Sequence, residues 1–345
     1  MPLDRIVGVL SLVPFVIGSM SGPAGVPSSV DLTFKDPAIV ESSGLVVRDG
    51  LFLTTNDSGD GGRVFVVDRS GETVGSTTWT LAPRDVEALA PAGPGELWVG
   101  DIGDNDGERK SVSVYKVKVG TGRIDVAPSP FRLVYPRSRP NAESLFVDRQ
   151  GRLNVITKSF GGGIVYRAPA QLSTKKANRL EAVGRVSEFA TDAALTRDGK
   201  HVIVRGPLFA GVYTLPDFRR VASFPLPTQP QGEGISVGPT GLVRVSTEGA
   251  RSAIRRVALP ASVTAALEPP ATPAPSASPT PSPSPSASPS ASPSADPSPA
   301  PPPSGDSSSE NGLGSIDPPW LMWCIPAVIA VGALGIGLGL RRRTE

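Results

Sequence analysis

A three-residue pattern recurs five times along the chain, and its spacing restricts what the chain can fold into. The pattern is an acidic or small residue, then Gly, Ala or Ser, then Leu or Ile. It occurs as Ser43-Gly44-Leu45, Glu87-Ala88-Leu89, Glu143-Ser144-Leu145, Ala193-Ala194-Leu195 and Glu233-Gly234-Ile235. Successive copies are 44, 56, 50 and 40 residues apart. Because repeats of this length are typical of propellers and solenoids, each copy indicates one structural unit.

Each copy opens a unit in which further strand-like runs follow in a fixed order. A second apolar run comes after a turn, and a third repeats independently, from Val64-Phe65 to Ala253-Ile254, at spacings of 50, 51, 47 and 41 residues. Fourth runs occur at residues 77–81, 131–135, 185–189 and 221–226. The fifth unit lacks one, and the alternating Val30, Leu32 and Phe34 can supply it, which leaves no open sheet edge. The sequence therefore predicts an all-β fold: a β-propeller of five four-stranded blades closed by the N-terminal strand, with a sixth blade in the long second unit as the alternative.

Both ends of the chain are apolar and predict secretion and membrane attachment. Arg5, the apolar residues 6–17 and the small residues 18–24 are typical of a secretory signal peptide, with an uncleaved N-terminal anchor as the alternative. A C-terminal transmembrane helix is predicted at 320–340, because this stretch has no charge and is followed by three arginines. The expected organisation is a signal peptide at 1–26, an extracellular propeller domain at 27–263, a disordered Pro/Ser/Ala-rich stalk at 264–319, the transmembrane helix at 320–340 and a cytoplasmic tail at 341–345.

The expected stalk consists mainly of Pro, Ser and Ala, which cannot build a core and favour polyproline II. Extended in this way, about forty residues would hold the domain roughly 100 Å from the membrane. Its Ser and Thr residues are candidates for O-glycosylation. The sequence thus predicts a type I single-pass protein of the cell membrane, with the propeller outside the cell.

Composition excludes several classes of function. The net charge of +2 comes from the last five residues, without which 31 basic and 31 acidic residues balance, so nucleic-acid binding has no support. The single cysteine, Cys324, lies in the predicted span, and His201 is the single histidine. The predicted domain therefore has no disulfide, and zinc sites and nucleophile–histidine pairs are disfavoured.

Polar residues are predicted to gather at one mouth of the central channel. The first strand of a blade lines the channel and the second runs back beside it, so residues that begin the first lie level with residues that end the second. We call this mouth the funnel. The pairs expected there are Glu41 with Asn56 and Asp57, Glu87 with Asp101, Glu143 with Lys158, Asp192 with Arg205, and Glu233 with Glu248.

Two copies of an Asp-x-Gly-Asp motif, at residues 57–60 and 101–104, lie at equivalent places in two blades. Clustered carboxylates with glycine turns suit calcium, which takes six to eight oxygen ligands. The alternative is that these Asp residues only cap turns through bonds to the backbone. Lys158 and Arg205 would bind an anionic group of a ligand, or else form ion pairs with Glu143 and Asp192. Candidate ligand-binding residues are Lys158, Arg205, Asp192 and Glu248.

The Glu-Ala-Leu and Glu-Gly-Ile triplets, Gly-Asp-Ile-Gly-Asp-Asn at 100–105 and Gln-Gly-Glu-Gly at 231–234 resemble motifs of the secreted calcium-dependent propellers. This superfamily includes phytase-like, lactonase-like and strictosidine-synthase-like proteins. The resemblance covers residues 36–260 and implies a metal at the channel mouth that acts on esters or phosphoesters. By position it implicates Asp57, Asp101, Glu87, Glu143 and Glu233 as metal ligands. The sequence departs from the pattern where Ser43 and Ala193 replace an acid, and where no histidine can serve as a base.

Two functions remain open from sequence. The first is a cell-surface binding or scaffold module for an unknown extracellular ligand, protein or glycan. The alternative is a calcium-dependent hydrolase of ester or phosphoester substrates with its site in the funnel. Whether the chain is an enzyme is left undecided.

Overall fold

The computed structural model describes residues 26–57 and 59–268, which belong to one compact unit at residues 1–274. The predicted signal peptide, membrane span and cytoplasmic tail and nearly all of the stalk lie outside the described residues, so the domain boundaries stay predictions. Within the described ranges, no helix is long and apolar enough to cross a membrane.

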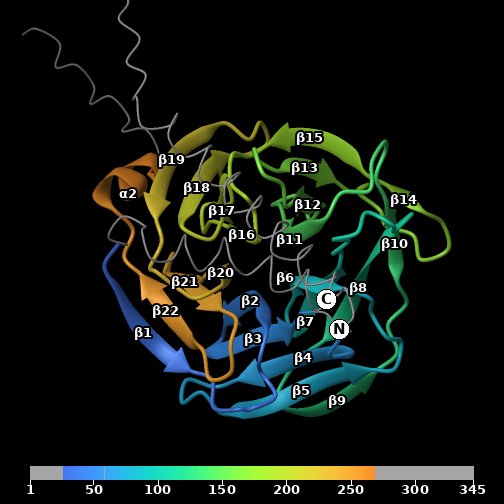
Figure 1. Ribbon diagram of the computed structural model, residues 1–345, viewed down its shortest axis with the longest axis horizontal. Helices are drawn as coiled ribbons and strands as arrows, with labels where there is room; N and C mark the ends of the chain where they lie inside the picture. Colours follow the sequence, from blue (N-terminus) through green and yellow to red (C-terminus); the bar gives the residue numbers. More distant parts are fainter. Residues whose placement is uncertain (1–25, 58, 269–345) are drawn as a thin grey trace, which may run out of the picture. The chain divides into compact units, whose positions relative to one another are not determined.

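Five sheets stand as blades around a central channel, as Figure 1 shows. Each of the first four blades is built on four antiparallel strands that follow one another across the sheet in chain order, and the fifth combines three strands with the N-terminal one. Blade 1 holds β2 (Ser42–Arg48), β3 (Leu51–Asn56), β4 (Gly62–Val67) and β5 (Thr73–Trp79). Blade 2 holds β6 (Val86–Gly93), β7 (Glu96–Asp101), β8 (Val112–Lys118) and β10 (Phe131–Val134), and blade 3 holds β11 (Ala142–Val147), β12 (Leu153–Thr157), β13 (Ile164–Arg167) and β15 (Glu181–Arg185). Blade 4 holds β16 (Asp192–Leu195), β17 (His201–Arg205), β18 (Phe209–Thr214) and β19 (Arg220–Pro225), and blade 5 holds β20 (Gly232–Val237), β21 (Val243–Thr247), β22 (Ala253–Val257) and β1 (Ser28–Thr33). The predicted five-bladed propeller is confirmed.

The recurring triplets lie on the inner strands β2, β6, β11, β16 and β20, and each inner strand contacts the next around the ring. The hydrophobic core is divided into five clusters, each between two neighbouring blades. This division follows from strand geometry, because alternate side chains of each strand point to opposite faces of its blade. Neighbouring blades cover both faces of the inner strands, which explains why these strands are buried along most of their length, whereas an outer strand such as β15 is largely exposed.

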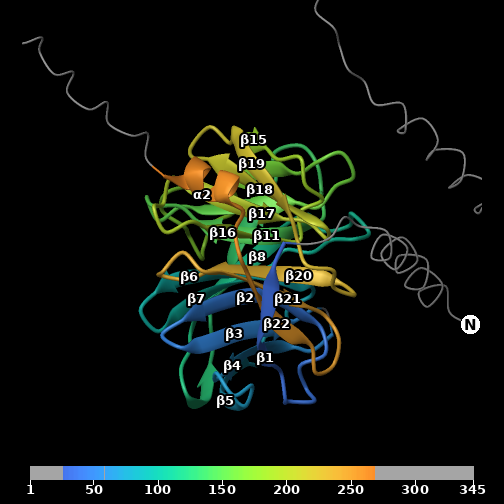
Figure 2. The ribbon, with the colours of Figure 1, turned by 90° about the vertical axis from the view of Figure 1, so that its left-hand side faces the viewer.

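The first and last strands close the ring. β1 pairs antiparallel with β22, in register from Ser28 with Val257 to Thr33 with Ala253. Figures 1 and 2 both show the two strands side by side, β1 in blue and β22 in orange. The short helix α2 (Ala261–Leu267) then packs against β19 of blade 4. The N-terminal strand closes the ring, as predicted, and β1 covers the edge of β22 that would otherwise be free.

Two features differ from the prediction. The fourth strand of blade 3 lies at Glu181–Arg185 and not at the predicted residues 185–189. Two outer strands were not foreseen: β9 (Gly122–Val126) pairs parallel with β5, and β14 (Asn178–Arg179) pairs parallel with β10. The extra length of the second unit therefore adds a fifth strand to blade 1 and does not form a sixth blade.

Candidate functional site

Bulges in the inner strands direct the predicted acidic residues. In the pairing of β6 with β7, Val86 lies opposite Asp101 and Ala88 lies opposite Gly100. Glu87 therefore has no partner of its own in β7 and is the extra residue of a β-bulge. Glu143 is the extra residue of β11 in the same way, and Glu233 lies within the corresponding irregular step of β20. A bulge bends its strand and re-aims a side chain. β16 has no such irregularity, and there Ala193 occupies the triplet position.

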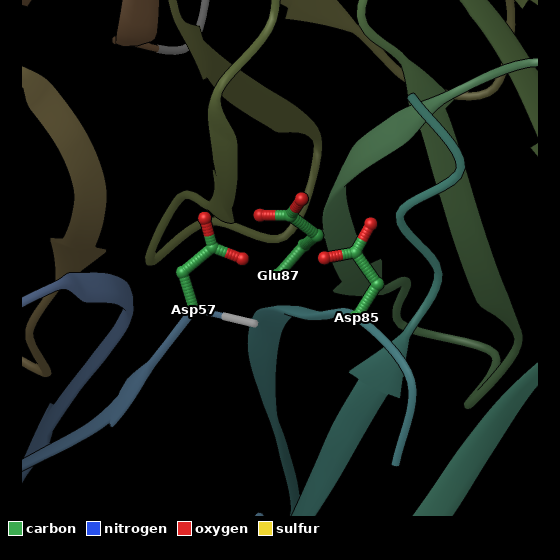
Figure 3. A group of neighbouring side chains, drawn as sticks. All are labelled: Asp57, Asp85 and Glu87. Carbon is green, nitrogen blue, oxygen red and sulfur yellow. The ribbon is translucent and has the colours of Figure 1, made fainter. Parts of the chain in front are cut away.

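Three carboxylates from two blades converge at the funnel. Asp57 follows β3, Asp85 precedes β6 and Glu87 lies in β6. One oxygen of each lies within 4.8 Å of the others, and Figure 3 shows the three groups turned toward a common point. We call these three residues the acidic cluster. Asp57 and Asp85 are partly exposed, whereas Glu87 is buried. The acidic cluster is thus accessible to solvent at Asp57 and Asp85 and enclosed by the protein at Glu87.

Gly103 leaves the space in which two of these carboxylates lie. A Cβ at this position would be 2.2 Å from Oδ2 of Asp85 and 2.7 Å from Oε1 of Glu87, far inside contact distance. The backbone here is held by Arg109, which donates to the Gly103 carbonyl at 2.6 Å. The second motif copy therefore requires glycine because any larger residue would occupy the space of the acidic cluster.

Asp101 was predicted as a metal ligand, but its carboxylate is bonded to an arginine and to backbone N–H groups. It pairs with the guanidinium of Arg109 at 2.8 Å and accepts the backbone N–H groups of Arg84 at 3.2 Å and Asp85 at 2.9 Å. Asp85, which the sequence analysis did not select, takes its place in the cluster. Asp101 positions the Asp85 backbone, and its role as a ligand is not favoured by this geometry.

The second Asp of each motif is held by bonds within the protein, and in the described part of the chain only Asp104 caps a turn through backbone N–H groups. Asp104 accepts the backbone N–H of Glu108 at 3.0 Å and of Arg109 at 3.0 Å. Asp60 pairs with Arg63 and accepts the Asn56 side-chain amide at 3.1 Å. Each motif thus ends in a structural carboxylate.

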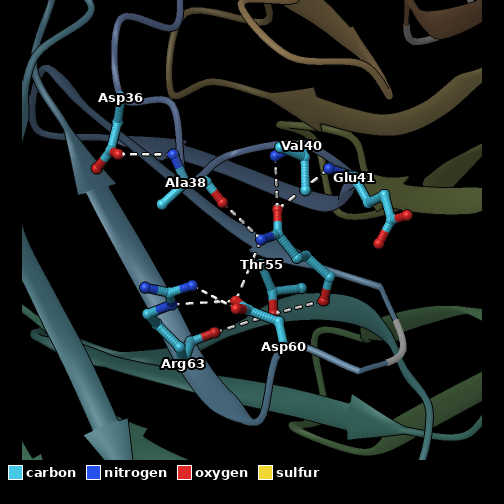
Figure 4. A network of polar contacts seen from close by, with 8 residues as sticks. Asp36, Ala38, Val40, Glu41, Thr55, Asp60 and Arg63 are labelled. Atoms are coloured by element: carbon cyan, nitrogen blue, oxygen red, sulfur yellow. Dashed lines mark hydrogen bonds and ion pairs between the residues drawn. The ribbon is translucent and has the colours of Figure 1, made fainter.

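Asn56 joins the funnel loops of blade 1, and Figure 4 shows residues of this network, among them Ala38, Val40 and Glu41. Its side-chain oxygen accepts the backbone N–H groups of Val40 at 3.1 Å and Glu41 at 3.2 Å, and its nitrogen donates to the Ala38 carbonyl at 2.8 Å. The Asp57 N–H in turn donates to the Glu41 carbonyl at 3.0 Å. These bonds fix the backbone from which Asp57 projects.

The predicted pair of Glu143 and Lys158 forms an ion pair in the funnel wall. Asn141, which the sequence analysis did not select, donates to Glu143 at 3.3 Å and accepts the Asp104 N–H at 2.8 Å, so it links blades 2 and 3. The Lys158 side chain is 15% exposed, which leaves its ammonium within reach of a bound ligand.

Asp192 and Arg205 are register partners, as predicted, but both are fully buried. The Arg205 guanidinium donates to the carbonyls of Gly234 at 2.6 Å and Ser246 at 2.8 Å. Asp192 accepts the N–H groups of Ala193 and Ile235, both at 2.8 Å. These contacts tie blade 4 to blade 5, and no ion pair joins the two side chains among the described contacts. Their predicted contact with a ligand stays untested, and their burial does not favour it.

Burial and mutual repulsion make the funnel a site that favours positive charge. The pKa of Asp85 is raised to about 7, first by burial and then by Asp57, although Arg109 lowers it. Burial, then Glu143 and Asp57, raise the pKa of Glu87 well above its usual value. Carboxylates crowded in this way gain most from a bound cation.

The other carboxylates of the funnel also have raised pKa values. Burial raises the pKa of Glu143 to about 8 although Lys158 lowers it, and burial followed by Glu233 raises the pKa of Glu248 to about 8. Burial also raises the pKa of Glu233. Burial lowers the pKa of Lys158, but Glu143 and Glu233 outweigh it and raise the pKa above its usual value, so the ammonium stays charged. The Lys158 ammonium therefore lies among more carboxylates than it can neutralise.

No known family model matches this chain, and no curated protein does. Among solved structures, glutaminyl cyclase from Myxococcus xanthus is similar at 14% identity and a TM-score of 0.44, covering 68% of this chain and 97% of that one. A gluconolactonase from Xanthomonas campestris is 14% identical with a TM-score of 0.40, covering 70% and 89%. A glucose dehydrogenase is 11% identical with a TM-score of 0.42, covering 68% and 100%. Similarity at this level says nothing about what this chain binds, so its function is argued from its own residues.

Proposed function

We propose that this chain is a membrane-anchored propeller at the cell surface that binds an extracellular ligand in its funnel, with calcium held by the acidic cluster. The observation that carries the proposal is the convergence of Asp57, Asp85 and Glu87 from two blades to within 4.8 Å. The anchor and the extracellular location rest on the sequence pattern of the two ends.

The residues present fit calcium. All three donors are carboxylates, the hard ligands that calcium prefers, and two oxygens bound at about 2.3–2.6 Å can lie up to about 5 Å apart. The space that Gly103 leaves open keeps both blade 2 carboxylates near the common point. Bound there, calcium would supply a positive charge and free coordination positions for oxygens of a ligand, because three carboxylates do not fill six to eight positions.

The second candidate is a calcium-dependent hydrolase of esters or phosphoesters. It is favoured by the position of Lys158, whose side chain is 15% exposed and whose ammonium pairs with Glu143. An ammonium next to a cation site can hold an anionic group of a substrate. In that case the funnel residues would bind and orient the substrate. A binding module would hold its ligand with the same residues.

Thermal melting of the full-length chain in detergent, with EDTA or with millimolar calcium, tests the proposal. Calcium that binds only the folded state at a hundred times its Kd stabilises by about 2.7 kcal/mol, which raises Tm by about 5–10 °C. We expect this rise in the wild type and its loss in a triple variant carrying Asp57→Asn, Asp85→Asn and Glu87→Gln.

The matched control is Asp125→Asn, which neutralises an exposed carboxylate of β9 far from the inner strands. It should keep the full calcium response. A wild-type Tm that calcium leaves unchanged would reject the metal site. Turnover of aryl esters or phosphates that the triple variant loses would favour the hydrolase, and calcium binding without turnover would favour the binding module.

A further inference from the structure

Three phenylalanines lie on the funnel face over blades 3 and 4. Phe160 follows β12, Phe189 precedes β16 and Phe209 begins β18, so all three lie level with the funnel. The side chain of Phe160 is 88% exposed and stacks on Phe189 with a centroid distance of 4.6 Å, while Phe209 is 44% exposed. We call these residues the aromatic rim. Because large apolar side chains are seldom displayed together on a monomer, such a group indicates an interaction site.

The loop that carries Phe160 is built to hold it in place. Gly161 and Gly162 have φ values of 95° and 101°, a region that favours glycine. A Cβ on Gly162 would lie 2.2 Å from the Val186 carbonyl oxygen, so the loop is packed closely against the neighbouring segment. The Gly162 N–H also donates to the Ser159 carbonyl at 3.1 Å. The exposure of Phe160 is therefore part of an ordered turn.

The aromatic rim is continuous with the funnel through Lys158. The Lys158 ammonium pairs with Glu143 and lies 5.2 Å from the centroid of the Phe189 ring. A cation at this distance from a ring is attracted by the ring's negative face. A ligand in the funnel that extends toward blade 4 would therefore meet Phe189 next.

A cavity of about 470 Å³ lies beside Phe189 and reaches Phe209. Its apolar lining is completed by Pro207 and Leu208, and its polar lining includes Ser187, Ser223 and Arg220. The Arg220 side chain is half exposed and only 4.0 Å from Glu188, at the outer limit of an ion pair, so its guanidinium retains donors for a ligand. The cavity thus combines flat apolar surface with hydrogen-bonding groups.

We propose that the aromatic rim and this cavity bind a sugar ring of a saccharide ligand. A pyranose ring has an apolar face of C–H groups and hydroxyls around its edge, and so matches both kinds of lining. A plain aromatic ring would cover the phenylalanines but make no hydrogen bonds with the serine hydroxyls or with the donors of Arg220. The inference rests on the proposed binding function and names the class of ligand for that site.

Saturation-transfer NMR on the full-length chain tests this proposal, with methyl β-D-glucopyranoside and methyl α-D-mannopyranoside as sugar probes and benzyl alcohol as the aromatic probe. We expect ring C–H signals from at least one pyranoside, in EDTA as well as in calcium. Phe160→Ala and Phe209→Ala should each weaken its affinity about three- to tenfold, the range for one lost ring contact. Leu81→Ala removes an exposed apolar side chain from blade 1 and should leave the affinity unchanged.

Binding of benzyl alcohol alone, binding of neither pyranoside, or equal losses in all three variants would overturn the proposal. Phe160 and Phe209 are exposed, so their variants should melt like the wild type, and melting curves check this. Because the NMR signal does not need calcium, its failure is distinguishable from failure of the metal site. Sugar binding without a calcium response would keep this inference and reject the metal.

Discussion

Gly103 is the residue through which the acidic cluster can be tested without changing any charge. In Gly103→Ala the new methyl group would lie 2.2 Å from Oδ2 of Asp85, so the carboxylates must move apart. We expect the calcium-induced rise in Tm to disappear or to need at least tenfold more calcium, as melting curves over a calcium titration would show.

The control for this prediction is Gly120→Ala. A Cβ at Gly120 meets only the Ile124 side chain, at 3.7 Å, which is ordinary contact. Gly120→Ala should therefore respond to calcium like the wild type. A Gly103→Ala variant with an unchanged calcium response would mean that the ion, if bound, does not lie between Asp85 and Glu87.

At this scale the sequence predicted Asp57 and Glu87 but not Asp85. Both motif copies looked equivalent, and only the fold shows that Asp101 is engaged by Arg109 and by backbone N–H groups. Strand alternation did not mark Asp85, because it precedes β6 and the bulge at Glu87 interrupts the alternation there. Asn141 had no signal, because its role depends on a loop of the neighbouring blade.

β1 is the element on which closure of the ring depends, and its two faces allow a matched test. Leu32 is buried in the cluster between blades 5 and 1, whereas Val30 on the same strand is half exposed. Leu32→Asp places an unpaired carboxylate in this core, which costs several kcal/mol, and we expect Tm to fall by about 10 °C or more.

Val30→Asp makes the same chemical change at the exposed position and should shift Tm by no more than about 2 °C. Melting curves of both variants, monitored by circular dichroism, provide the measurement. Equal losses in the two variants would mean that β1 does not pack as described, and no loss in Leu32→Asp would mean that closure contributes little to stability.

Elements that bury apolar residues were predictable, and those that do not were missed. Inner strands and their partners follow from apolar runs that recur at nearly constant spacing. β9 is mostly exposed and is held by parallel pairing with β5, so it has no apolar pattern of its own. The fourth strand of blade 3 was misplaced because β15 is largely exposed and so has no apolar pattern that fixes its bounds.

For the whole molecule, the funnel predicts an unusual dependence of stability on pH. Asp85, Glu143 and Glu248 have folded-state pKa values of about 7, 8 and 8, above those of the unfolded chain. Between about pH 4.5 and 8 the folded state therefore binds more protons than the unfolded state, and the metal-free protein loses stability as pH rises through this window. We expect Tm in EDTA to fall from pH 5 to pH 8.

Calcium should oppose this trend at the acidic cluster, because it competes with protons for the oxygens of Asp85 and Glu87. The calcium-induced rise in Tm should be small at pH 5 and largest near pH 8. Melting at several pH values with and without calcium measures both effects. A metal-free Tm that rises steadily toward pH 8 would contradict the burial of these carboxylates in the folded state.

The pairing of β1 with β22 also has a consequence for the order of folding. Ser28 and Val257 are neighbours in the closed ring but are separated by nearly the whole described chain, so their contact carries the largest loop-closure cost of any in the sheets. The acidic cluster needs only blades 1 and 2, which adjoin in the sequence. During synthesis the acidic cluster can therefore assemble before β22, the partner of β1, has been made. Ring closure is expected to be the last and slowest step of folding.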